Sequence, residues 1–380
     1  YLAHHEGTGG ARAFLRNQNS GDLNKFAKQV GLQRAKDLTR AAGGDVALAY
    51  RLWLNAYMNE HIRPAKFRKP SAVAGEGPAV VTSEPTELRT FDGAPIPVAL
   101  LGGHSRLVLE LQQVLSRLGY VDPPADGKWG PVSNWGLTEF CKANRLSLTE
   151  GFTRDIAQAL ANPAKTLPDI KPTGDWFDKV MAYMDRKRHW VCRHPLAANI
   201  VYLEGLNPDG TLNDDRENVF NDLRVVFAIG TSGKPALTSW EGTTEPGIFW
   251  TMKPMNINGA ARIAFGQYKS WVVGTHLKGR ASAHEALVQV GEVTVHRDLN
   301  KDFMRTNDKT DTGLFGINQH WGYDAPKDNL GSTSAGCLVG RTKKGHREFM
   351  ATLKADPRFV ASPAYRFMAA VLPADEVMAA

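Results

Sequence analysis

Cysteine is scarce in the sequence, and long apolar runs are missing from it. The 380 residues include three cysteines, Cys141, Cys192 and Cys337. An odd number leaves at least one thiol without a disulfide partner, so that thiol is either a small buried side chain or a reactive group. No apolar run approaches the roughly 20 residues that a transmembrane helix needs. We therefore expect no membrane span.

Metal motifs and a secretion signal are missing as well. No His, Cys or Glu spacing matches a zinc site such as H-E-x-x-H or paired C-x-x-C, so the sequence predicts neither a metal nor a cofactor. The chain starts Tyr1-Leu2-Ala3-His4-His5, without an initiating Met, a basic n-region or an apolar h-region. We expect a processed, truncated or trimmed chain, and earlier removal of a signal peptide is compatible with this start.

The composition fits a globular protein of two or three domains. Hydrophobic residues make up 42% and charged residues 22% of the chain. The net charge is +7, and short basic clusters lie at 63–69, 186–188 and 341–347. Because aromatic residues do not interleave with these clusters, nucleic acid is not a predicted partner. The clusters indicate a solvated basic surface or a mild attraction to an anionic polymer.

Helical patterns dominate the first half of the chain. Residues 1–69 place apolar side chains at three- and four-residue spacing, which predicts a helical segment. Residues 70–100 are expected to form a linker, because prolines this frequent prevent a regular helix. A shorter linker is expected at 166–176. The prolines of the two breaks are Pro70, Pro78, Pro85, Pro95, Pro97, Pro163, Pro168 and Pro172.

Residues 101–165 carry the pattern of three short helices. The first helix has one apolar face and ends at Gly119, the second runs through Leu137 and Phe140, and the third spans 153–160. A Leu-Gly-Tyr ending, an Asp-Gly-x-aromatic-Gly turn and a helix ending in Phe follow one another here. The apolar face of the first helix consists of Leu107, Leu111, Val114, Leu115 and Leu118.

In these features the stretch resembles the peptidoglycan-binding three-helix module. It departs from that family at Cys141, where the family usually has Gln after Phe. A generic helical bundle is the alternative. The resemblance implies peptidoglycan as a partner and places the binding residues in and beside the turn, at Tyr120, Asp126, Gly127, Trp129 and Gly130.

From residue 177 onward the pattern changes to that of strands. After a helix at 176–186, apolar Leu223, Val225, Phe227 and Ile229 recur at every second position, the period of a sheet. The sequence predicts a multidomain α + β protein with a helical N-terminal segment, a three-helix bundle and a mainly β, chiefly antiparallel domain at 177–380. Hairpin turns are expected at 209–210 and 232–233, and further strands within 247–253, 261–276 and 287–298.

The stretch 312–340, TGLFGINQHWGYDAPKDNLGSTSAGCLVG, carries the clearest chemistry. His320 lies near a strand end, and a polar loop leads from it to Cys337. Free Cys has a pKa of roughly 8.5, and a neighbouring imidazole is the usual activator of its thiolate. Gly336 allows a tight turn that presents N–H groups to a carbonyl oxygen. We expect Cys337 to be a nucleophile whose pKa is lowered by His320, with a buried structural thiol as the alternative.

This arrangement resembles the L,D-transpeptidase (YkuD-like) motif, in which a histidine and a loop precede Ser/Thr-His-Gly-Cys. Ser334, Gly336 and Cys337 fall on the motif, whereas Ala335 replaces its second histidine. Leu-Val-Gly at 338–340 replaces the usual Arg or Asn after the cysteine. The stretch 207–350 therefore resembles a divergent branch of this group, of the SAGC type.

The resemblance implies a cysteine-dependent enzyme that acts on peptidoglycan peptide stems through a thioester. Transfer to an amine would make it an L,D-transpeptidase, and transfer to water an L,D-carboxypeptidase or endopeptidase. A catalytically silent wall-binding protein is the alternative from a different class. The implied location is the periplasm or cell envelope, after export, or a phage-encoded lytic protein. Beside the catalytic set Cys337, His320, Ser334 and Gly336, the candidates for substrate contact are Arg341, Arg297, His276 and Trp321.

Three further sequence patterns carry weaker signals. The opening YLAHHEGTGGARAFL resembles the end of a lysozyme-like lytic transglycosylase domain, but Glu6 is expected to be a surface residue. His276, His296 and Arg262 could line the same cleft as Cys337, or form ordinary structural contacts. Residues 298–309 begin like a calcium loop with Asp298, Asn300 and Asp302, but lack its Gly and its final Glu, so calcium is the minor alternative.

Overall fold

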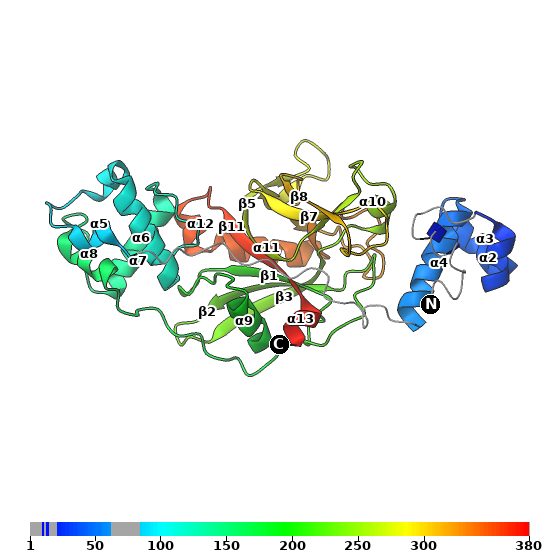
Figure 1. Cartoon of the computed structure of the whole chain (residues 1–380), viewed down its shortest axis with the longest axis horizontal. Coiled ribbons are helices and arrows are strands. Elements are labelled where there is room, and N and C mark those ends of the chain that lie inside the picture. The colour runs from blue at the N-terminus through cyan, green and yellow to red at the C-terminus, as the bar shows by residue number, and fades with distance from the viewer. Residues whose placement is uncertain (1–9, 11–12, 15–20, 62–83, 380) are drawn as a thin grey trace.

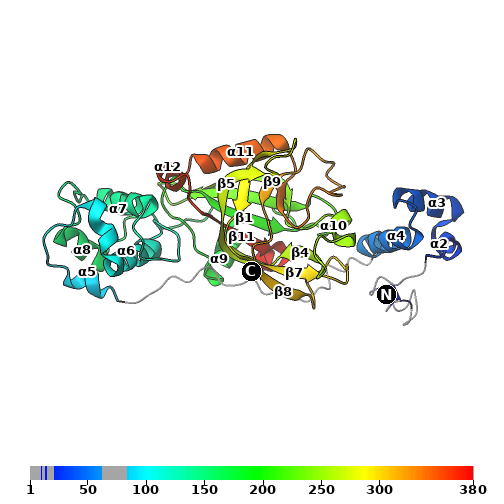
Figure 2. The ribbon, with the colours of Figure 1, turned by 90° about the horizontal axis from the view of Figure 1, so that it is seen from above.

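The computed structural model describes residues 10, 13–14, 21–61 and 84–379. Most of the stretch that resembles a lytic transglycosylase, Glu6 included, and much of the expected proline-rich linker lie outside these residues. None of the described helices combines the length and the apolar character that crossing a membrane requires. Figures 1 and 2 both show a β-rich body in the middle, with N-terminal helices at one end and a helical bundle at the other.

Between residues 21 and 61, the N-terminal unit contains the helices α2 (Leu23–Val30), α3 (Leu32–Ala41) and α4 (Val46–His61). Phe26, Tyr50 and Leu54 are buried between them and form a small core of their own. Arg51 of α4 is also buried, and its Nη2 donates to the carbonyl oxygen of Lys301 at 3.1 Å. This hydrogen bond joins the unit to a loop of the β-rich body.

The helical bundle contains the three expected helices and two short ones before them. Gly119 ends α6 in the left-handed conformation, with φ 91°. Thr153 caps α8 by accepting the N–H of Ile156. Leu88 and Leu101, from the end of the stretch expected as a linker and just beyond it, are buried in the same core. The elements are α5 (Thr86–Thr90), the 3-10 helix η2 (Val98–Gly103), α6 (Ser105–Leu118), α7 (Pro131–Ala143) and α8 (Arg154–Ala161).

Eight strands of the body form a closed barrel in the order β1-β11-β5-β6-β9-β10-β3-β2. Most neighbours are antiparallel, as expected, but the pairs β1–β11 and β9–β10 are parallel. The expected hairpin at 232–233 joins β2 to β3. The strands are β1 (Asn199–Glu204), β2 (Asp222–Ile229), β3 (Pro235–Thr243), β5 (Gly266–His276), β6 (His284–Gln289), β9 (Gln319–Trp321), β10 (Leu338–Gly340) and β11 (Phe367–Pro373).

Helices and a second sheet surround the barrel. Phe177 of α9 packs edge-on against Phe227 of β2, with ring centroids 5.0 Å apart. Because β2 is covered in this way, nearly all of its residues are buried, on both faces. The remaining elements are α9 (Phe177–Arg186), α11 (Lys343–Lys354), α12 (Pro357–Ala361), α13 (Ala374–Met378) and a sheet of β4 (Ala260–Ile263), β7 (Val293–Asp298) and β8 (Lys309–Gly313). The expected multidomain α + β class is confirmed.

Three of the expected strands differ in the structure. Residues 247–253 contain the short helix α10 (Ile248–Met252) instead of a strand. The N–H groups of Gly247 and Phe249 donate to the carbonyl oxygens of Ser334 and Gly331, which holds this turn of helix against a loop. The runs 261–276 and 287–298 each split into two strands of different sheets. The chain passes from the second sheet into the barrel within the first run, and from the barrel back to the second sheet within the second.

Buried charges join the bundle to the barrel. Asp122, which follows α6, is fully buried and pairs with Lys269 of β5 at 2.8 Å and with Arg358 of α12 at 3.2 Å. Arg358 also pairs with Asp356 at 2.7 Å, and Tyr365 donates to Asp122 at 2.8 Å. Burial alone would raise the pKa of Asp122, but the two cations hold it below its usual value.

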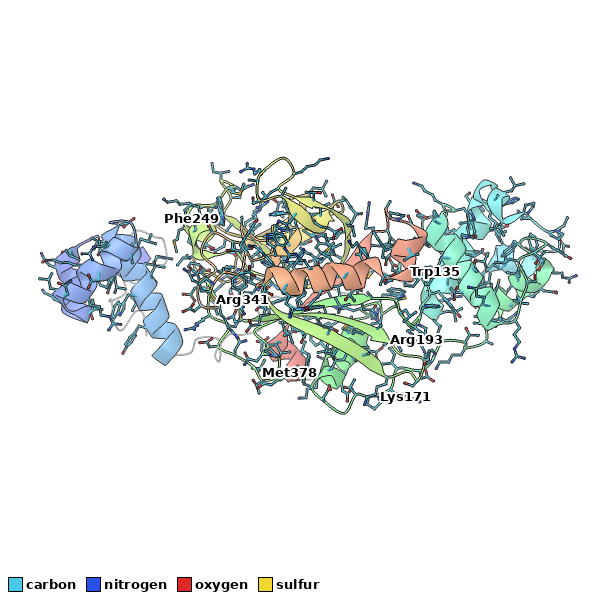
Figure 3. All side chains as sticks on the ribbon, turned by 180° about the vertical axis from the view of Figure 1, so that it is seen from behind. Trp135, Lys171, Arg193, Phe249, Arg341 and Met378 are labelled. Carbon is cyan, nitrogen blue, oxygen red and sulfur yellow. The ribbon has the colours of Figure 1, made fainter. Side chains whose placement is uncertain are left out.

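Hydrogen bonds from the segment before β1 add to this junction. Trp190 Nε1 donates to the carbonyl oxygen of Ser116, and the N–H of Arg193 donates to that of Gly119, both at 2.9 Å. Figure 3 shows Trp135 and Arg193 where the bundle meets the body. The bundle therefore packs directly on the barrel.

Replacing Arg358 with Ala should lower the free energy of unfolding by about 3–5 kcal/mol, because two buried carboxylates lose their shared cation. Urea unfolding followed by circular dichroism measures the loss. The control is Lys354→Ala, which removes an exposed ion pair with Glu285 and should cost at most about 1 kcal/mol. Equal losses in the two variants would contradict the importance of the buried network.

Candidate active site around Cys337

The candidate nucleophile and base lie on adjacent parallel strands. In the β9–β10 pair, His320 lies opposite Val339. Cys337 directly precedes β10 and is buried in the same small cluster as Val339, so both side chains leave the backbone on one side. The thiol and the imidazole therefore share a face, one diagonal step apart. Because parallel strands need a crossover connection, the polar loop between the two residues is a consequence of this pairing.

Ser334 and Gly336 shape the turn that leads into Cys337. The buried Ser334 hydroxyl donates to the Cys337 carbonyl oxygen at 2.9 Å and accepts the N–H of Gly336 at 3.1 Å. Gly336 has φ 119°, and a Cβ there would lie 2.2 Å from the carbonyl oxygen of Ala261. These two residues of the predicted catalytic set thus hold the backbone that presents the thiol.

The sulfur of Cys337 is almost enclosed. The residue is 9% exposed, its Sγ accepts the N–H of Asn318 at 3.4 Å, and its S–H donates to the Gly316 carbonyl oxygen at 3.5 Å. Burial raises the pKa of the thiol to about 11, against a smaller opposing effect of the Asn318 N–H. The thiol is therefore protonated at neutral pH, and the expectation of a lowered pKa is wrong.

His320 is buried in a defined tautomer. Its Nδ1 lies 2.8 Å from the carbonyl oxygen of Trp321. Since a carbonyl oxygen can only accept, Nδ1 carries the proton and Nε2 keeps its lone pair. Burial, followed by the neighbouring His276, lowers the pKa of His320 well below 6.5. The imidazole is thus neutral and able to accept a proton, and an ion pair with the thiol is not favoured.

Three further histidines surround His320. His276 stacks on it with ring centroids 4.0 Å apart and 8° between the planes. His284 lies 5.9 Å from His320 and stacks on Trp321 at 3.8 Å, while His346 of α11 lies 5.9 Å from His284. Burial is the main cause that lowers the pKa of His276 to about 4 and that of His346 to about 3. This cluster is therefore uncharged at neutral pH.

Asn318 links the cluster to the thiol, and the sequence reasoning missed it. Its Nδ2 lies 3.0 Å from His276 Nδ1, while its Oδ1 accepts the N–H of Gln289 at 2.9 Å. The bond to Gln289 assigns the amide orientation, so Asn318 donates to His276. Asn318 stands two positions before His320, and closeness along the chain was the signal that could have identified it.

Tyr323 and His284 were missed as well. Tyr323 adopts a positive φ of 58° in the loop after β9, and its ring centroid lies 6.2 Å from that of His320. Its pKa is raised by burial and then by the charge that Cys337 carries when ionised. His284 comes from β6, far from the motif in sequence, so only the barrel topology brings it to the site.

The predicted substrate-contact residues fall into two groups. His276 and Trp321 belong to the histidine cluster, and Arg341 lies just after β10 (Figure 3). Arg341 Nε donates to the Glu241 carboxylate at 2.7 Å. Arg297 lies instead in the second sheet, where it pairs with Asp311 at 2.9 Å.

His296 and Arg262 also belong to the second sheet. They are register partners in the β4–β7 pair, and both are buried. Arg262 forms an ion pair with the buried Glu245. Burial is the main cause that lowers the pKa of His296, to about 4. The contacts of His296 and Arg262 therefore match the alternative of ordinary structural contacts better than a role beside Cys337.

Carboxylates gather beside this sheet without a clear fit to a cation. Among the described residues, ligand oxygens of Glu204, Asp215 and Glu245 lie within 4.8 Å of one another. Arg305 pairs with Glu204 and Arg262 pairs with Glu245, so guanidinium groups already supply positive charge there.

The calcium-like loop uses its oxygens internally. Asp298 accepts the N–H groups of Asp302 at 3.1 Å and of Phe303 at 3.0 Å. The side chain of Asn300 donates to Asp302 at 2.8 Å. These turn-type hydrogen bonds explain the residue pattern without an ion.

In the bundle, Gln112 forms hydrogen bonds with two of the predicted wall-binding residues. Its Oε1 accepts the N–H groups of Asp126 at 3.1 Å and Gly127 at 2.8 Å, and its Nε2 donates to the Asp126 carboxylate at 3.0 Å. Gly127 has φ 69°, and Tyr120 is fully buried. These residues hold the turn and the core of the bundle. The other two predicted residues, Trp129 and Gly130, are half-buried before α7.

Comparison with known proteins adds little to this description. No protein-family model matches the chain, and no curated protein matches its sequence. Among solved structures, it is similar to a fused Zn-dependent amidase/peptidase/peptidoglycan-binding domain-containing protein from Clostridium acetobutylicum. That match has 14% identity and a TM-score of 0.23, and covers 70% of this chain and 94% of the other.

Gly336→Ala should lower the free energy of unfolding by about 3 kcal/mol or more, because the new Cβ would meet the Ala261 carbonyl oxygen in addition to the backbone strain. The control is Gly316→Ala, which has φ 74° but open space around a Cβ, so only the left-handed conformation should cost about 1–2 kcal/mol. Urea unfolding compares the two, and similar losses would rule out the close approach to Ala261.

Proposed function

We propose that the chain is a cell-wall enzyme, an L,D-transpeptidase that acts on peptide stems of peptidoglycan through a thioester on Cys337. The proposal is supported most by one observation. A buried thiol and a buried histidine share one face of the β9–β10 pair, and the Trp321 carbonyl oxygen fixes the tautomer that leaves Nε2 able to accept a proton. The sequence resemblance to L,D-transpeptidases supplies the substrate class.

The first half-reaction forms the thioester. As the sulfur attacks the carbonyl at the L-centre of the diamino acid, the S–H proton passes to Nε2 of His320. Collapse of the tetrahedral intermediate breaks the C–N bond to D-alanine, whose amine takes the proton from the imidazolium. The N–H groups of Gly336 and Leu338 already bond to Ser334 and to the Asn318 carbonyl oxygen. The candidate oxyanion donor is therefore the N–H of Cys337 itself.

The second half-reaction consumes the thioester. An acceptor amine attacks the carbonyl while neutral His320 accepts its proton, a new C–N bond forms, the C–S bond breaks, and the proton returns to the sulfur. Water as the acceptor gives a carboxylic acid by the same steps, so the hydrolase differs from the transferase only in the second substrate. The masses of products from purified muropeptides separate the two activities.

A silent wall-binding protein is the second candidate, and the enclosure of Cys337 favours it. A thiol that is 9% exposed with its pKa raised to about 11 is a poor nucleophile unless a base removes its proton during attack. Since the base must then be His320, the two candidates differ in measurable turnover.

Cys337→Ala should reduce turnover of disaccharide-peptide muropeptides by a factor on the order of 10⁴ or more, because the acyl acceptor is lost. Cys141→Ala and Cys192→Ala are the matched controls, since both thiols are buried in other cores. Mass spectrometry of the products measures the rates. Near wild-type activity in Cys337→Ala would refute the mechanism, and no turnover in any variant would favour the silent protein.

The protonation states predict different pH profiles for alkylation and turnover. Alkylation needs thiolate, which forms only as the pH approaches the raised pKa of about 11, so iodoacetamide should react slowly at pH 7 and faster through pH 9. Turnover needs neutral His320, whose pKa is lowered, so activity should persist below pH 6.5. With Cys141 and Cys192 replaced by Ala, His320→Ala should abolish most turnover and leave the alkylation profile unchanged. Rapid alkylation at pH 7 that depends on His320 would contradict the neutral pair and support an ion pair of thiolate and imidazolium.

A further inference from the structure

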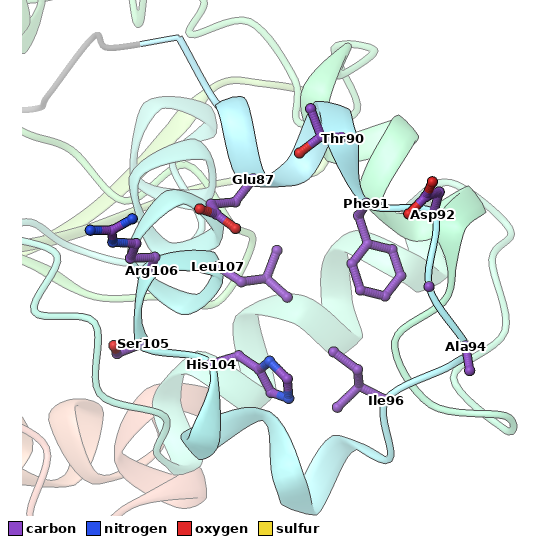
Figure 4. A pocket seen from close by; sticks show the side chains of 11 residues that line it. Glu87, Thr90, Phe91, Asp92, Ala94, Ile96, His104, Ser105, Arg106 and Leu107 are labelled. Atoms are coloured by element: carbon purple, nitrogen blue, oxygen red, sulfur yellow. The ribbon is translucent and has the colours of Figure 1, made fainter.

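The pocket of the helical bundle belongs to the predicted wall-binding module. It has a volume of about 600 Å³, and Phe91 and Ile96 are among its lining residues (Figure 4). It adjoins the turn at 126–130, since a Cβ on Gly127 would lie 3.0 Å from the carbonyl oxygen of Ser105, another residue of the lining. A buried cation in the wall of the barrel is a separate feature, because it belongs neither to this module nor to the thiol and imidazole of the candidate active site.

Arg224 of β2 is 0% exposed and carries a charge that it cannot lose. Burial lowers the pKa of its guanidinium, but an arginine starts so far above neutrality that it stays protonated. No carboxylate of the described residues pairs with it, and the ionisable group that acts on it as a possible anion is Tyr202. Burial raises the pKa of Tyr202 to about 12, so this hydroxyl is neutral. The charge of Arg224 therefore has no counter-charge in the part of the chain that the structure describes.

Aromatic rings and one imidazole contact the guanidinium. Its central carbon lies 4.1 Å from the centroid of the Phe349 ring and 5.3 Å from that of Trp240. Such cation–π contacts offset only part of the cost of burying an ion. Nη1 donates to Nδ1 of His346 at 3.3 Å, because His346 Nε2 lies 2.9 Å from the Glu285 carbonyl oxygen and so carries the proton. These groups hold the guanidinium in place, but none of them is an anion.

The other edge of the guanidinium is unused. Neither Nε nor Nη2 of Arg224 has a hydrogen-bond partner within the described residues. These two N–H groups point the same way and form the fork with which arginine binds anions. Nε2 of Gln319 is also buried without a partner there, and Gln319 accepts the hydroxyl of Tyr202, the register neighbour of Arg224, at 3.2 Å. Because these three atoms are all donors, the partner that they lack is an acceptor.

We propose that Nε and Nη2 of Arg224 bind one small monovalent anion of the size of chloride. The charge of the ion follows from the single guanidinium that it balances. Its size follows from the packing, since Arg224, Tyr202 and Gln319 are all fully buried and a Cβ at Gly340 would lie 2.3 Å from Nη2. A water molecule can accept the same hydrogen bonds, but it does not balance the charge. The site does not depend on turnover by Cys337, so it stands or falls apart from the proposed function.

Crystals of the full chain grown in sodium bromide test the site directly. Bromide replaces chloride and is located by its anomalous scattering. We expect an anomalous peak within hydrogen-bond distance of both Nε and Nη2 of Arg224. An ordered water at that place without anomalous signal, or bromide only at exposed lysines, would overturn the proposal. This measurement uses the unchanged chain and needs no variant that folds.

Thermal unfolding at constant ionic strength is the second test. When sodium gluconate, whose anion is too large for the site, is replaced by sodium chloride, the unfolding midpoint should rise by roughly 3 °C or more, because the ion binds only the folded state. Arg224→Met should lose this dependence on chloride. The matched control Arg262→Met removes another fully buried arginine, but one that pairs with Glu245, and it should keep the dependence. Equal midpoints of the intact chain in the two salts, or an equal rise in Arg224→Met, would contradict the site.

Discussion

The parallel pairing of β9 with β10 is the constraint on which the candidate site depends. Two parallel neighbours cannot be joined by a tight turn, so the chain leaves the barrel after Trp321 and returns just before Cys337. The return must be sharp, and Gly336 and the Ser334 hydroxyl make it so. The positions of thiol and imidazole therefore follow from the backbone hydrogen bonds of a closed barrel, whose register cannot slip without moving every neighbouring strand.

The same enclosure determines the charge state of the site. An ion pair of thiolate and imidazolium would need two charges in a region where burial raises the pKa of Cys337 and lowers that of His320. The neighbouring His276, whose ring centroid lies 4.0 Å away, lowers the pKa of His320 further. Both effects act in the same direction and keep the pair neutral. The proton must then move as the carbon–sulfur bond forms, which makes the fixed Nδ1 bond of His320 more important than thiolate formation in advance.

Sequence patterns predicted the local features of the fold better than the long-range ones. The apolar spacing of α6, its end at Gly119 and the β2–β3 hairpin were visible because each depends on neighbours in the chain. The pattern at 247–253 predicts a strand where the structure has the helix α10, because a short apolar run has no distinguishing period. The parallel β1–β11 and β9–β10 pairs depend on strands brought together by the whole barrel, which no local pattern encodes.

The candidate site divides in the same way. His320 and Cys337 stood out because their spacing matches a motif, but His284 reaches them from β6 and had no signal of its own. The predicted lowering of the thiol pKa was wrong for a related reason. The motif indicates which groups are near one another, whereas the pKa depends on how much water the surrounding barrel excludes. Asp126 and Gly127 stood out for their motif as well, but in the structure they serve the turn, where their N–H groups donate to Gln112.

The junction between bundle and barrel holds the bundle at a set distance from Cys337. The buried charges of Asp122 and Arg358, with the partly exposed Lys269, join the two parts, so the bundle is held against the barrel instead of moving on a flexible tether. A flexible tether would raise the local concentration of stems around the thiol over a range of distances. A rigid junction raises it only for a stem at one separation and orientation from a stem held by the bundle. Binding in the bundle would then select which neighbouring stem reaches Cys337, and mutations at the junction would alter that selection without touching either site.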